Sequence, residues 1–117
     1  KALDEAASAL MRATDWVLAQ GSDIGHALAA SVPYLQLWGV TVGGWQLARA
    51  ATISARLLRT NEPHDTFHAE KISTARYYAT HALTQHLALE REITRAETVM
   101  AIEPEAFASE RTRLAAY

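Results

Sequence analysis

The chain has 117 residues and a near balance of 13 acidic and 11 basic side chains, which gives a formal net charge of −2. This balance provides no basic surface of the kind that binds nucleic acid or anionic lipid, so we expect neither partner. Because the chain has no cysteine, disulfides, thiolate metal sites and a cysteine nucleophile are excluded.

The first predicted element is an amphipathic helix that ends before Gly21. Gly21 stands where a left-handed residue commonly ends a helix, and the side-chain oxygens of Ser22 and Asp23 can cap the next one. Alanine is abundant and β-branched residues are scattered, which together predict an all-α fold. The apolar residues of this first helix recur at steps of three and four: Leu3, Ala6, Leu10, Ala13 and Val17.

The second predicted helix covers residues 23–58 and contains a stretch without formal charge between His26 and Arg49. Because proline lacks an amide hydrogen and clashes with the preceding turn, we expect a kink or a short break at Pro33. The stretch is long enough to cross a bilayer, but its glutamines, its proline and the lack of a long Leu, Ile and Val run argue against a membrane span. It also lacks the strand and the glycine spacing of a nucleotide-binding loop.

We therefore expect this stretch to be the central helix of a bundle, surrounded on nearly all sides. Gly39, Gly43 and Gly44 have no side chains, which lets another backbone come close, so we expect a tight crossing there with the first or third helix. Trp38 and Trp45 are seven residues apart and lie on nearly the same side of the helix. We expect them to bury a large area at that crossing or at an interface.

A third predicted helix follows a turn cluster and continues to about residue 96. A short apolar segment then ends at Ile102, and residues 105–117 are expected to form a final, more exposed helix. The predicted architecture is an antiparallel bundle of three to four main helices, with a kinked central helix and a short C-terminal helix. The stripe of the third helix alternates steps of three and four residues: Ile72, Ala75, Ala79, Ala82, His86, Leu89, Ile93 and Ala96.

Three histidines are candidates for metal ligands or for buried, hydrogen-bonded residues. His64 and His68 are four residues apart, so both imidazoles can face one metal ion. The glutamates of the zinc-protease and di-iron patterns are missing, so we favour exposed or hydrogen-bonded histidines and keep a metal-dependent bundle as an alternative. His86 is expected in the core or an interface with a hydrogen-bonded neighbour. No serine or acid stands in a recognisable catalytic arrangement, which indicates a packing or assembly module.

Four stretches taken together resemble a known family. They are ATDWVLAQ at 13–20, PYLQLWGVTVGGWQLARAA at 33–51, KISTARYYATHAL at 71–83 and ETVMAI at 97–102. The set is similar to the C-terminal helical domain of the larger bacterial acyl-CoA dehydrogenases, the acetyl-CoA dehydrogenase-like C-terminal domain. The resemblance covers the chain to about Phe107, and its most specific part is PYL followed by GGW and LARAA.

The resemblance implies a larger parent flavoenzyme that binds FAD noncovalently and oxidises acyl-CoA to trans-2-enoyl-CoA with an active-site glutamate. No position of this chain matches that glutamate, so we expect no catalytic residue here and no FAD held by this segment without its parent. The implied partners are the catalytic domains of the parent chain and its acyl-CoA substrate, and we expect a cytoplasmic homo-oligomer. Helical periodicity begins beside Lys1, so we interpret residues 1–117 as one accessory domain of a longer chain.

Seven positions are expected to matter for structure or for an interface. For Arg49 and Arg76, a surface ion pair explains the residue as well as an interdomain contact does. Thr84 stands where the family is expected to have a proline, which predicts a straighter third helix. The alternative function is a non-enzymatic helical interaction module that acts through an exposed apolar face. The seven positions are Trp38, Gly39, Gly43, Gly44, Trp45, Arg49 and Arg76.

Overall fold

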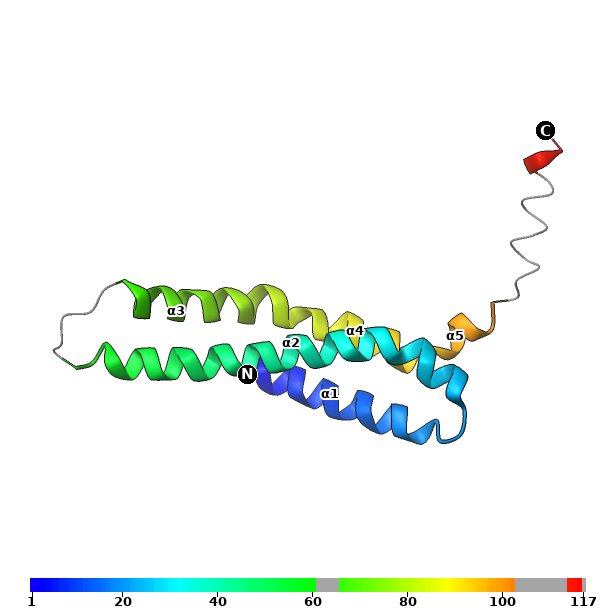
Figure 1. Cartoon of the computed structure of the whole chain (residues 1–117), viewed down its shortest axis with the longest axis horizontal. Helices are drawn as coiled ribbons and strands as arrows, with labels where there is room; N and C mark the ends of the chain where they lie inside the picture. The colour runs from blue at the N-terminus through cyan, green and yellow to red at the C-terminus, as the bar shows by residue number, and fades with distance from the viewer. Residues whose placement is uncertain (61–65, 103–113, 117) are drawn as a thin grey trace.

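The structure is a computed structural model that describes residues 1–60, 66–102 and 114–116. Those residues form helices and turns and no strand (Figure 1), so the predicted all-α class is confirmed. Two helices come first, α1 (Ala2–Ala19) and α2 (Ile24–Leu57). The chain then returns antiparallel to α2 through α3 (Phe67–Tyr77), a π-helical segment η1 (Tyr78–Ala82), a 3-10 segment η2 (Leu83–Gln85), α4 (His86–Thr94) and α5 (Glu97–Met100).

The turn between α1 and α2 forms at the residues that the sequence indicates. Gly21 has a φ of +59°, a left-handed conformation that side chains disfavour. Asp23 then caps α2, because its Oδ1 accepts a hydrogen bond from the His26 amide at 3.3 Å. Its Oδ2 lies 2.6 Å from Nδ1 of the same histidine. These contacts lower the pKa of Asp23, the backbone hydrogen bond from His26 contributing most.

α2 is one helix of 34 residues that continues through Pro33. The short break expected there is therefore wrong, and a kink stays a prediction. Packing supplies the reason, since Ala30 and Leu37 are fully buried on either side of the proline and hold both parts of the helix against its neighbours.

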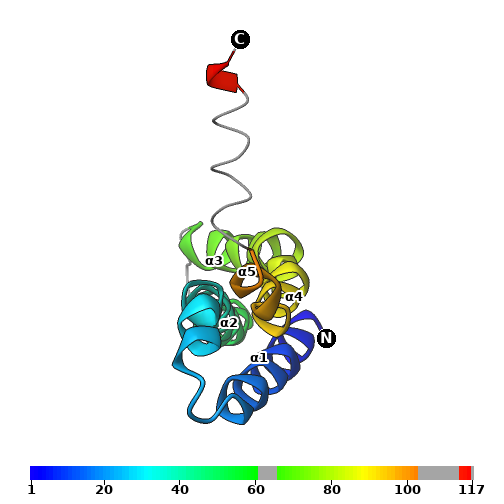
Figure 2. The same cartoon turned by 90° about the vertical axis from the view of Figure 1, so that its right-hand side faces the viewer.

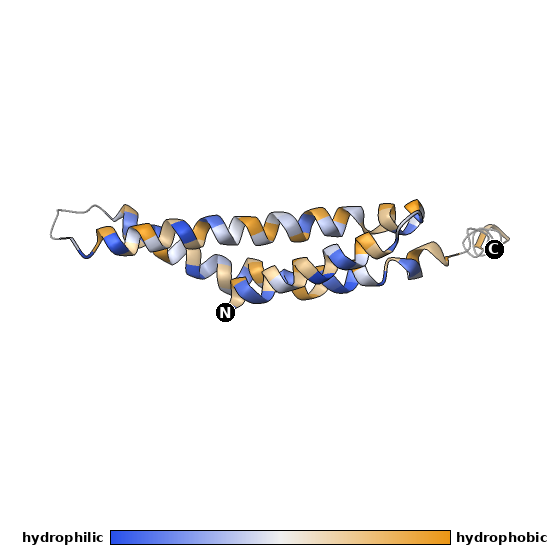
Figure 3. Ribbon diagram, turned by 90° about the horizontal axis from the view of Figure 1, so that it is seen from below, coloured by the Kyte–Doolittle hydropathy of each residue, from blue (hydrophilic) through white to orange (hydrophobic). Residues whose placement is uncertain are grey.

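The expectation that α2 is surrounded on nearly all sides is also wrong. Its buried residues are Ala30, Leu37, Thr41, Gly44 and Ser54. The opposite side carries large apolar residues in the open, and hydrophobic residues recur along the whole length of the helix (Figure 3). A helix that is apolar all round is typical of a buried position, so its exposed side requires an explanation.

The predicted third helix is interrupted between α3 and α4 by η1 and η2, and the straighter course expected from Thr84 stays a prediction. A π-turn is wider than an α-turn and shifts the register of the residues that follow it. Leu83 is consequently buried at this point, whereas the predicted stripe residue Ala82 is only half-buried. The interruption lies beside Tyr78, whose hydroxyl donates a hydrogen bond to the Val40 carbonyl at 3.0 Å.

The bundle has two unlike halves. In Figure 1, α1 runs along only one half of α2, and α3 runs along the other. We call α1, α4 and residues 24–43 of α2 the closed half, and α3 with residues 44–57 of α2 the open half. Seen along the bundle (Figure 2), α1, α2 and α4 face one another around the core. The main core cluster lies there and consists of Ala13, Ala30, Leu37, Leu89, Ile93 and Ala96.

No helix among the described residues combines the length and the apolar content that a bilayer crossing needs. Most of the helix expected over residues 105–117, and the candidate metal ligand His64, lie outside the described residues. In the described part of the chain, no group of three or more His, Asp or Glu side chains is placed to hold a metal ion.

Candidate docking surface

The exposed side of α2 carries the largest concentration of apolar side chains outside the core. Leu28, Val32 and Leu35 are 64–73% exposed, and Trp38 and Trp45 are about half exposed. We define the outer α2 face as Leu28, Val32, Leu35, Trp38, Gly39, Trp45 and Ile53. Such contiguous apolar surface commonly marks an interaction site.

The outer α2 face has the spacing of a helix-packing seam. Its central positions alternate steps of four and three residues, which is the pattern that places side chains in a line along one side of a helix. A second series with the same spacing lies on the buried side and includes Leu37, Thr41 and Gly44. α2 therefore has two packing sides, and the described helices occupy one. The outer series is 28, 32, 35, 39, 42, 46, 49 and 53.

The three glycines lie in different surroundings. A Cβ at Gly43 would lie 2.6 Å from Tyr78 Oη, and a Cβ at Gly44 would lie 2.8 Å from Leu83 Cδ2. At these two positions the returning chain therefore packs very close to α2. Gly39 is exposed and has nothing within 4 Å of a built Cβ. The tight crossing expected at Gly39 is wrong, because this glycine faces outward.

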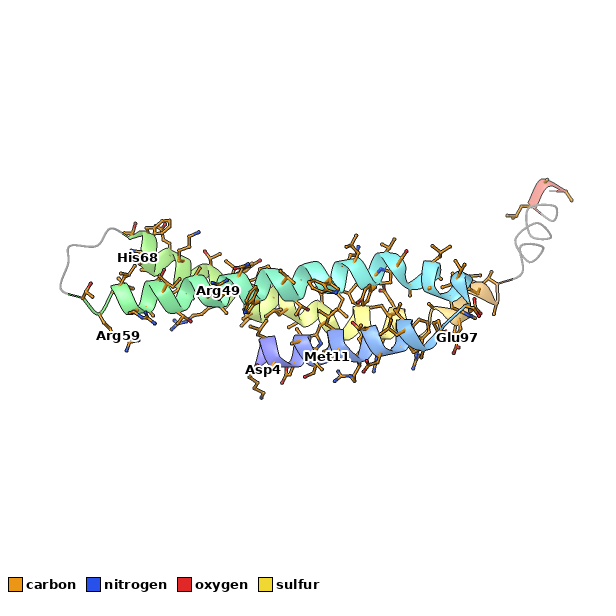
Figure 4. The ribbon with its side chains drawn as sticks, turned by 60° about the horizontal axis from the view of Figure 1, so that its bottom comes forward. Asp4, Met11, Arg49, Arg59, His68 and Glu97 are labelled. Atoms are coloured by element: carbon orange, nitrogen blue, oxygen red, sulfur yellow. The ribbon has the colours of Figure 1, made fainter. Side chains whose placement is uncertain are left out.

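The two tryptophans and Arg49 stand at the edge of the outer α2 face. The Arg49 guanidinium lies 5.0 Å from the centre of the Trp45 ring, a cation–π contact within one side of the helix. Arg49 is exposed, and Figure 4 shows its place along α2. Arg49 thus combines with Trp45 at the surface, and in the described part of the chain no carboxylate forms an ion pair with it.

A groove of about 430 Å³ lies in the open half, between α2 and α3. Its α2 side is made of small residues, among them Gly44, Ala48 and Ala51, and its α3 side includes Ala75 and Arg76. Lys1, Ala2 and Leu3 close one end of it. We call this feature the open groove. Arg76, one of the predicted positions, lines this groove.

One ion pair fastens the closed half. Arg12 of α1 donates two hydrogen bonds to the Glu90 carboxylate of α4, at 2.6 and 2.9 Å. The hydrogen bonds from Arg12 lower the pKa of Glu90, and they raise the pKa of Arg12 itself. This pair ties α1 to α4 and has the geometry of a bidentate structural contact.

The described histidines have surroundings that differ from one another. His86 is 7% exposed, as expected for a core histidine, and its Nδ1 has no hydrogen-bond partner among the described atoms, so the bonded neighbour stays a prediction. His68 Nδ1 lies 3.3 Å from the Ser54 hydroxyl. His81 stacks on Tyr77 with the ring centres 4.3 Å apart.

Of the outer α2 face, only Trp38, Gly39 and Trp45 were predicted as structural or interface positions, and the open groove was not predicted as a surface. The sequence did contain a signal for the outer α2 face, because the positions from Leu28 to Ile53 have the same alternating spacing as the inner series. The groove left no such signal, because alanines that line a groove and alanines that pack in a core have the same pattern.

Comparisons with known proteins add the family. A search of curated proteins and a search of solved structures each found no match. The family described as "Acetyl-CoA dehydrogenase C-terminal like" matches residues 1–103. The match covers most of the chain and confirms the resemblance seen in its sequence. This chain belongs to the acetyl-CoA dehydrogenase C-terminal-like family.

Proposed function

We propose that residues 1–117 form an accessory helical domain of a larger FAD-dependent acyl-CoA dehydrogenase and serve its assembly, not its chemistry. The observation that carries this proposal is the family match over residues 1–103. The parent enzyme would oxidise acyl-CoA to trans-2-enoyl-CoA in the cytoplasm. Its FAD and its catalytic base would belong to the catalytic domains of the same chain.

The outer α2 face supports an assembly role. Fully burying one exposed leucine or valine side chain contributes about 1.5–3 kcal/mol, so even partial burial of Leu28, Val32 and Leu35 favours association. Trp38 and Trp45 add large side chains of the kind enriched in interfaces. Gly39 adds a place where a partner helix can approach closely. We propose that this face docks on the catalytic domains or on a second copy in the homo-oligomer.

The other predicted positions receive distinct roles in this proposal. Gly43 and Gly44 keep the returning chain close to α2 and so maintain the shape of the domain. Arg49 extends the docking face beside Trp45, where its charge can meet a carboxylate of the partner.

The activity is tested on the full-length protein. We expect it to purify with a flavin absorbance spectrum and to lose that absorbance when an acyl-CoA substrate from a panel of chain lengths is added. A colourless full-length protein that responds to no thioester would contradict the proposal and favour the non-enzymatic interaction module. The isolated 117-residue chain should not retain FAD, and stoichiometric tight binding in a titration would show that the division of roles is wrong.

The docking face is tested with two matched substitutions in the full-length protein. Leu35→Glu places a charge in the outer α2 face, and Leu87→Glu places the same charge on an exposed leucine of α4. We expect the first variant to release the domain, seen as faster limited proteolysis around it or as a smaller assembly in light scattering. The second should behave like the unmodified protein. Equal behaviour of the two variants would exclude this face as the interface.

A further inference from the structure

We propose that the outer α2 face pairs with the same face of a second copy of this chain. The two α2 helices would run antiparallel and cross at Gly39, so that Trp45 of each copy enters a hollow between α1 and α2 of the other. Arg49 would then meet Asp15 across the interface. This inference deepens the assembly role proposed above and rests on that role, but it does not depend on the acyl-CoA chemistry.

The outer α2 face is large enough for such a pair. Its large apolar side chains are each about half to three-quarters exposed. Because complete burial of an aromatic side chain covers about 150–250 Å², and of an aliphatic one somewhat less, each of them offers on the order of 100 Å². Two copies packed face to face would cover on the order of 1,200 Å², which exceeds the roughly 1,000 Å² expected of a specific interface. These side chains are Leu28, Val32, Leu35, Trp38, Trp45 and Ile53.

Gly39 supplies the crossing point. It lies near the middle of the outer series, which begins at Leu28 and ends at Ile53. Glycine weakens a helix interior, and nothing in the described part of the chain lies within 4 Å of a Cβ built on Gly39, so α2 alone gains no packing from it. In a two-fold pair the same patch of each copy faces the other. Two glycines that meet at the axis let the two helix backbones approach closely.

A hollow of about 400 Å³ lies between α1 and α2, beside the outer α2 face. In the antiparallel pair, Trp45 lies six residues beyond the axis at Gly39, which places it about 9 Å along the helix. It is then level with residue 33 of the other copy, next to the hollow. An indole ring there would cover the apolar lining of the hollow. The lining residues are Leu10, Met11, Thr14, Asp15, Tyr34 and Trp38.

The position of α1 explains why the pair must be antiparallel. α1 runs along only one half of α2 (Figure 1), so the hollow lies on one side of Gly39 and Trp45 lies on the other. A chain therefore cannot fill its own hollow with its own Trp45. An antiparallel pair brings each hollow to the Trp45 of the other copy, whereas a parallel pair would place Trp45 against the half that lacks α1.

The charges agree with the same arrangement. Asp15 in the hollow is exposed, and so is Arg49, about one helical turn beyond Trp45. Among the described residues, neither of these two charged groups forms an ion pair. With Trp45 in the hollow, the Arg49 guanidinium can reach Asp15 of the other copy. A parallel pair would bring two Arg49 side chains to one level, where like charges oppose association.

Photo-cross-linking in the full-length protein tests the proposal. The photoreactive residue p-benzoylphenylalanine replaces Gln46, which is exposed in the outer series, or Leu87, which is exposed on α4 and serves as the matched control. Irradiation of the Gln46 probe should join two full-length chains, seen as a doubled mass on a denaturing gel. Mass spectrometry should locate the reacted site at about residues 28–36 of the other copy, because residue 32 is level with position 46. The Leu87 probe should not react with those residues.

Charge reversal tests the contact between Arg49 and Asp15. In the protein with the Gln46 probe, Arg49→Asp and Asp15→Arg should each lower the yield of joined chains at least about threefold, since each places like charges together. The double variant restores opposite charges and should recover most of the yield. Arg91→Asp, the same change on α4, should leave it unaltered. A double variant no better than the single ones would contradict the pairing.

Other cross-links overturn the inference. Reaction of the Gln46 probe near residue 46 of the other copy would show a parallel pair. Reaction with the catalytic domains would show a different occupant, and the absence of joined chains would show that no second copy covers this face.

The two proposals fail separately. A full-length protein with flavin and thioester response whose probe reacts with the catalytic domains would retain the proposed function and lose the pair. A colourless and unresponsive protein whose chains still join through residues 28–36 would lose the enzyme and retain the pair.

Discussion

Residues 24–43 of α2 pack against both α1 and α4. Residues 44–57 of the same helix lie beside α3, and because α1 does not extend along them, a groove is left there. Leu37 and Ile93 are fully buried in the closed half, while α3 has no fully buried residue. One continuous helix thus belongs to a filled core along one half and to an incomplete core along the other. The inner side of α2 in the open half consists of small residues that line a groove instead of a filled core.

This difference indicates that α2 is built for more neighbours than the described helices supply. Apolar residues occur on both of its sides, and stability in a helical protein comes mainly from packing such faces. The closed half can satisfy one side by itself. In the proposed assembly, the outer α2 face would gain its contacts from the rest of the assembled parent protein.

The strongest test of the comparison truncates one inward-facing apolar side chain in each half. Leu37→Ala should destabilise the domain by about 2–5 kcal/mol, because it leaves a cavity in a filled core. Ile72→Ala in α3 removes a side chain that is only half-buried beside the open groove and should cost less, about 1 kcal/mol. Urea denaturation of the 117-residue chain gives both values. Similar losses would mean that the two halves are equally packed.

Hydrogen exchange of α3 and α4, the two main helices of the returning chain, also tests the contrast between the open and the closed half. In the 117-residue chain, amides of α3 should exchange at least about tenfold faster than those of α4, since α4 buries His86, Leu89 and Ile93. If α3 and α4 are equally protected in the isolated chain, the open half is more stable than its burial indicates.

Two glycine substitutions should have opposite signs. Gly44→Ala adds a Cβ that would lie 2.8 Å from buried Leu83, so crowding should outweigh the gain in helix propensity and cost about 1–2 kcal/mol. Gly39→Ala meets open space and should stabilise the isolated chain by about 0.5–1 kcal/mol. Thermal unfolding of both variants measures the difference. A stabilising Gly44→Ala would show that Leu83 can move aside.

The smallest expected effect concerns the ion pair between Arg12 of α1 and Glu90 of α4. Because the folded state lowers the pKa of Glu90, the pair stabilises the fold at neutral pH, and this contribution is lost as the pH falls through the lowered pKa. Glu90→Gln should lower stability slightly at pH 7 and hardly at all in acid, since the pair is partly exposed. Glu92→Gln, on the same helix, is the matched control. A Glu90→Gln effect that does not diminish toward low pH would contradict the assignment.

Local features of the fold could be predicted well. The left-handed conformation at Gly21 and the cap at Asp23 follow from the chemistry of those residues, and the apolar period of α1 correctly places Ala6 and Ala13 in the interior. The candidate surface was predicted less well. Trp38, Trp45 and Arg49 were identified as interface positions, which stays a prediction, but Gly39 was assigned to a crossing that forms at Gly43 and Gly44.

The amino-acid sequence by itself determined the helical class, the turn at Gly21 with its cap at Asp23, and the family resemblance, because these depend on near neighbours and on periodicity. Only the tertiary structure decided which side of α2 is buried, since the inner and outer series have the same spacing and both contain apolar residues. It also decided that the third helix is interrupted at Tyr78–Gln85, where the return chain packs around Gly43 and Gly44. Periodicity defines the faces of a helix, but the length and placement of its neighbours determine which face is covered.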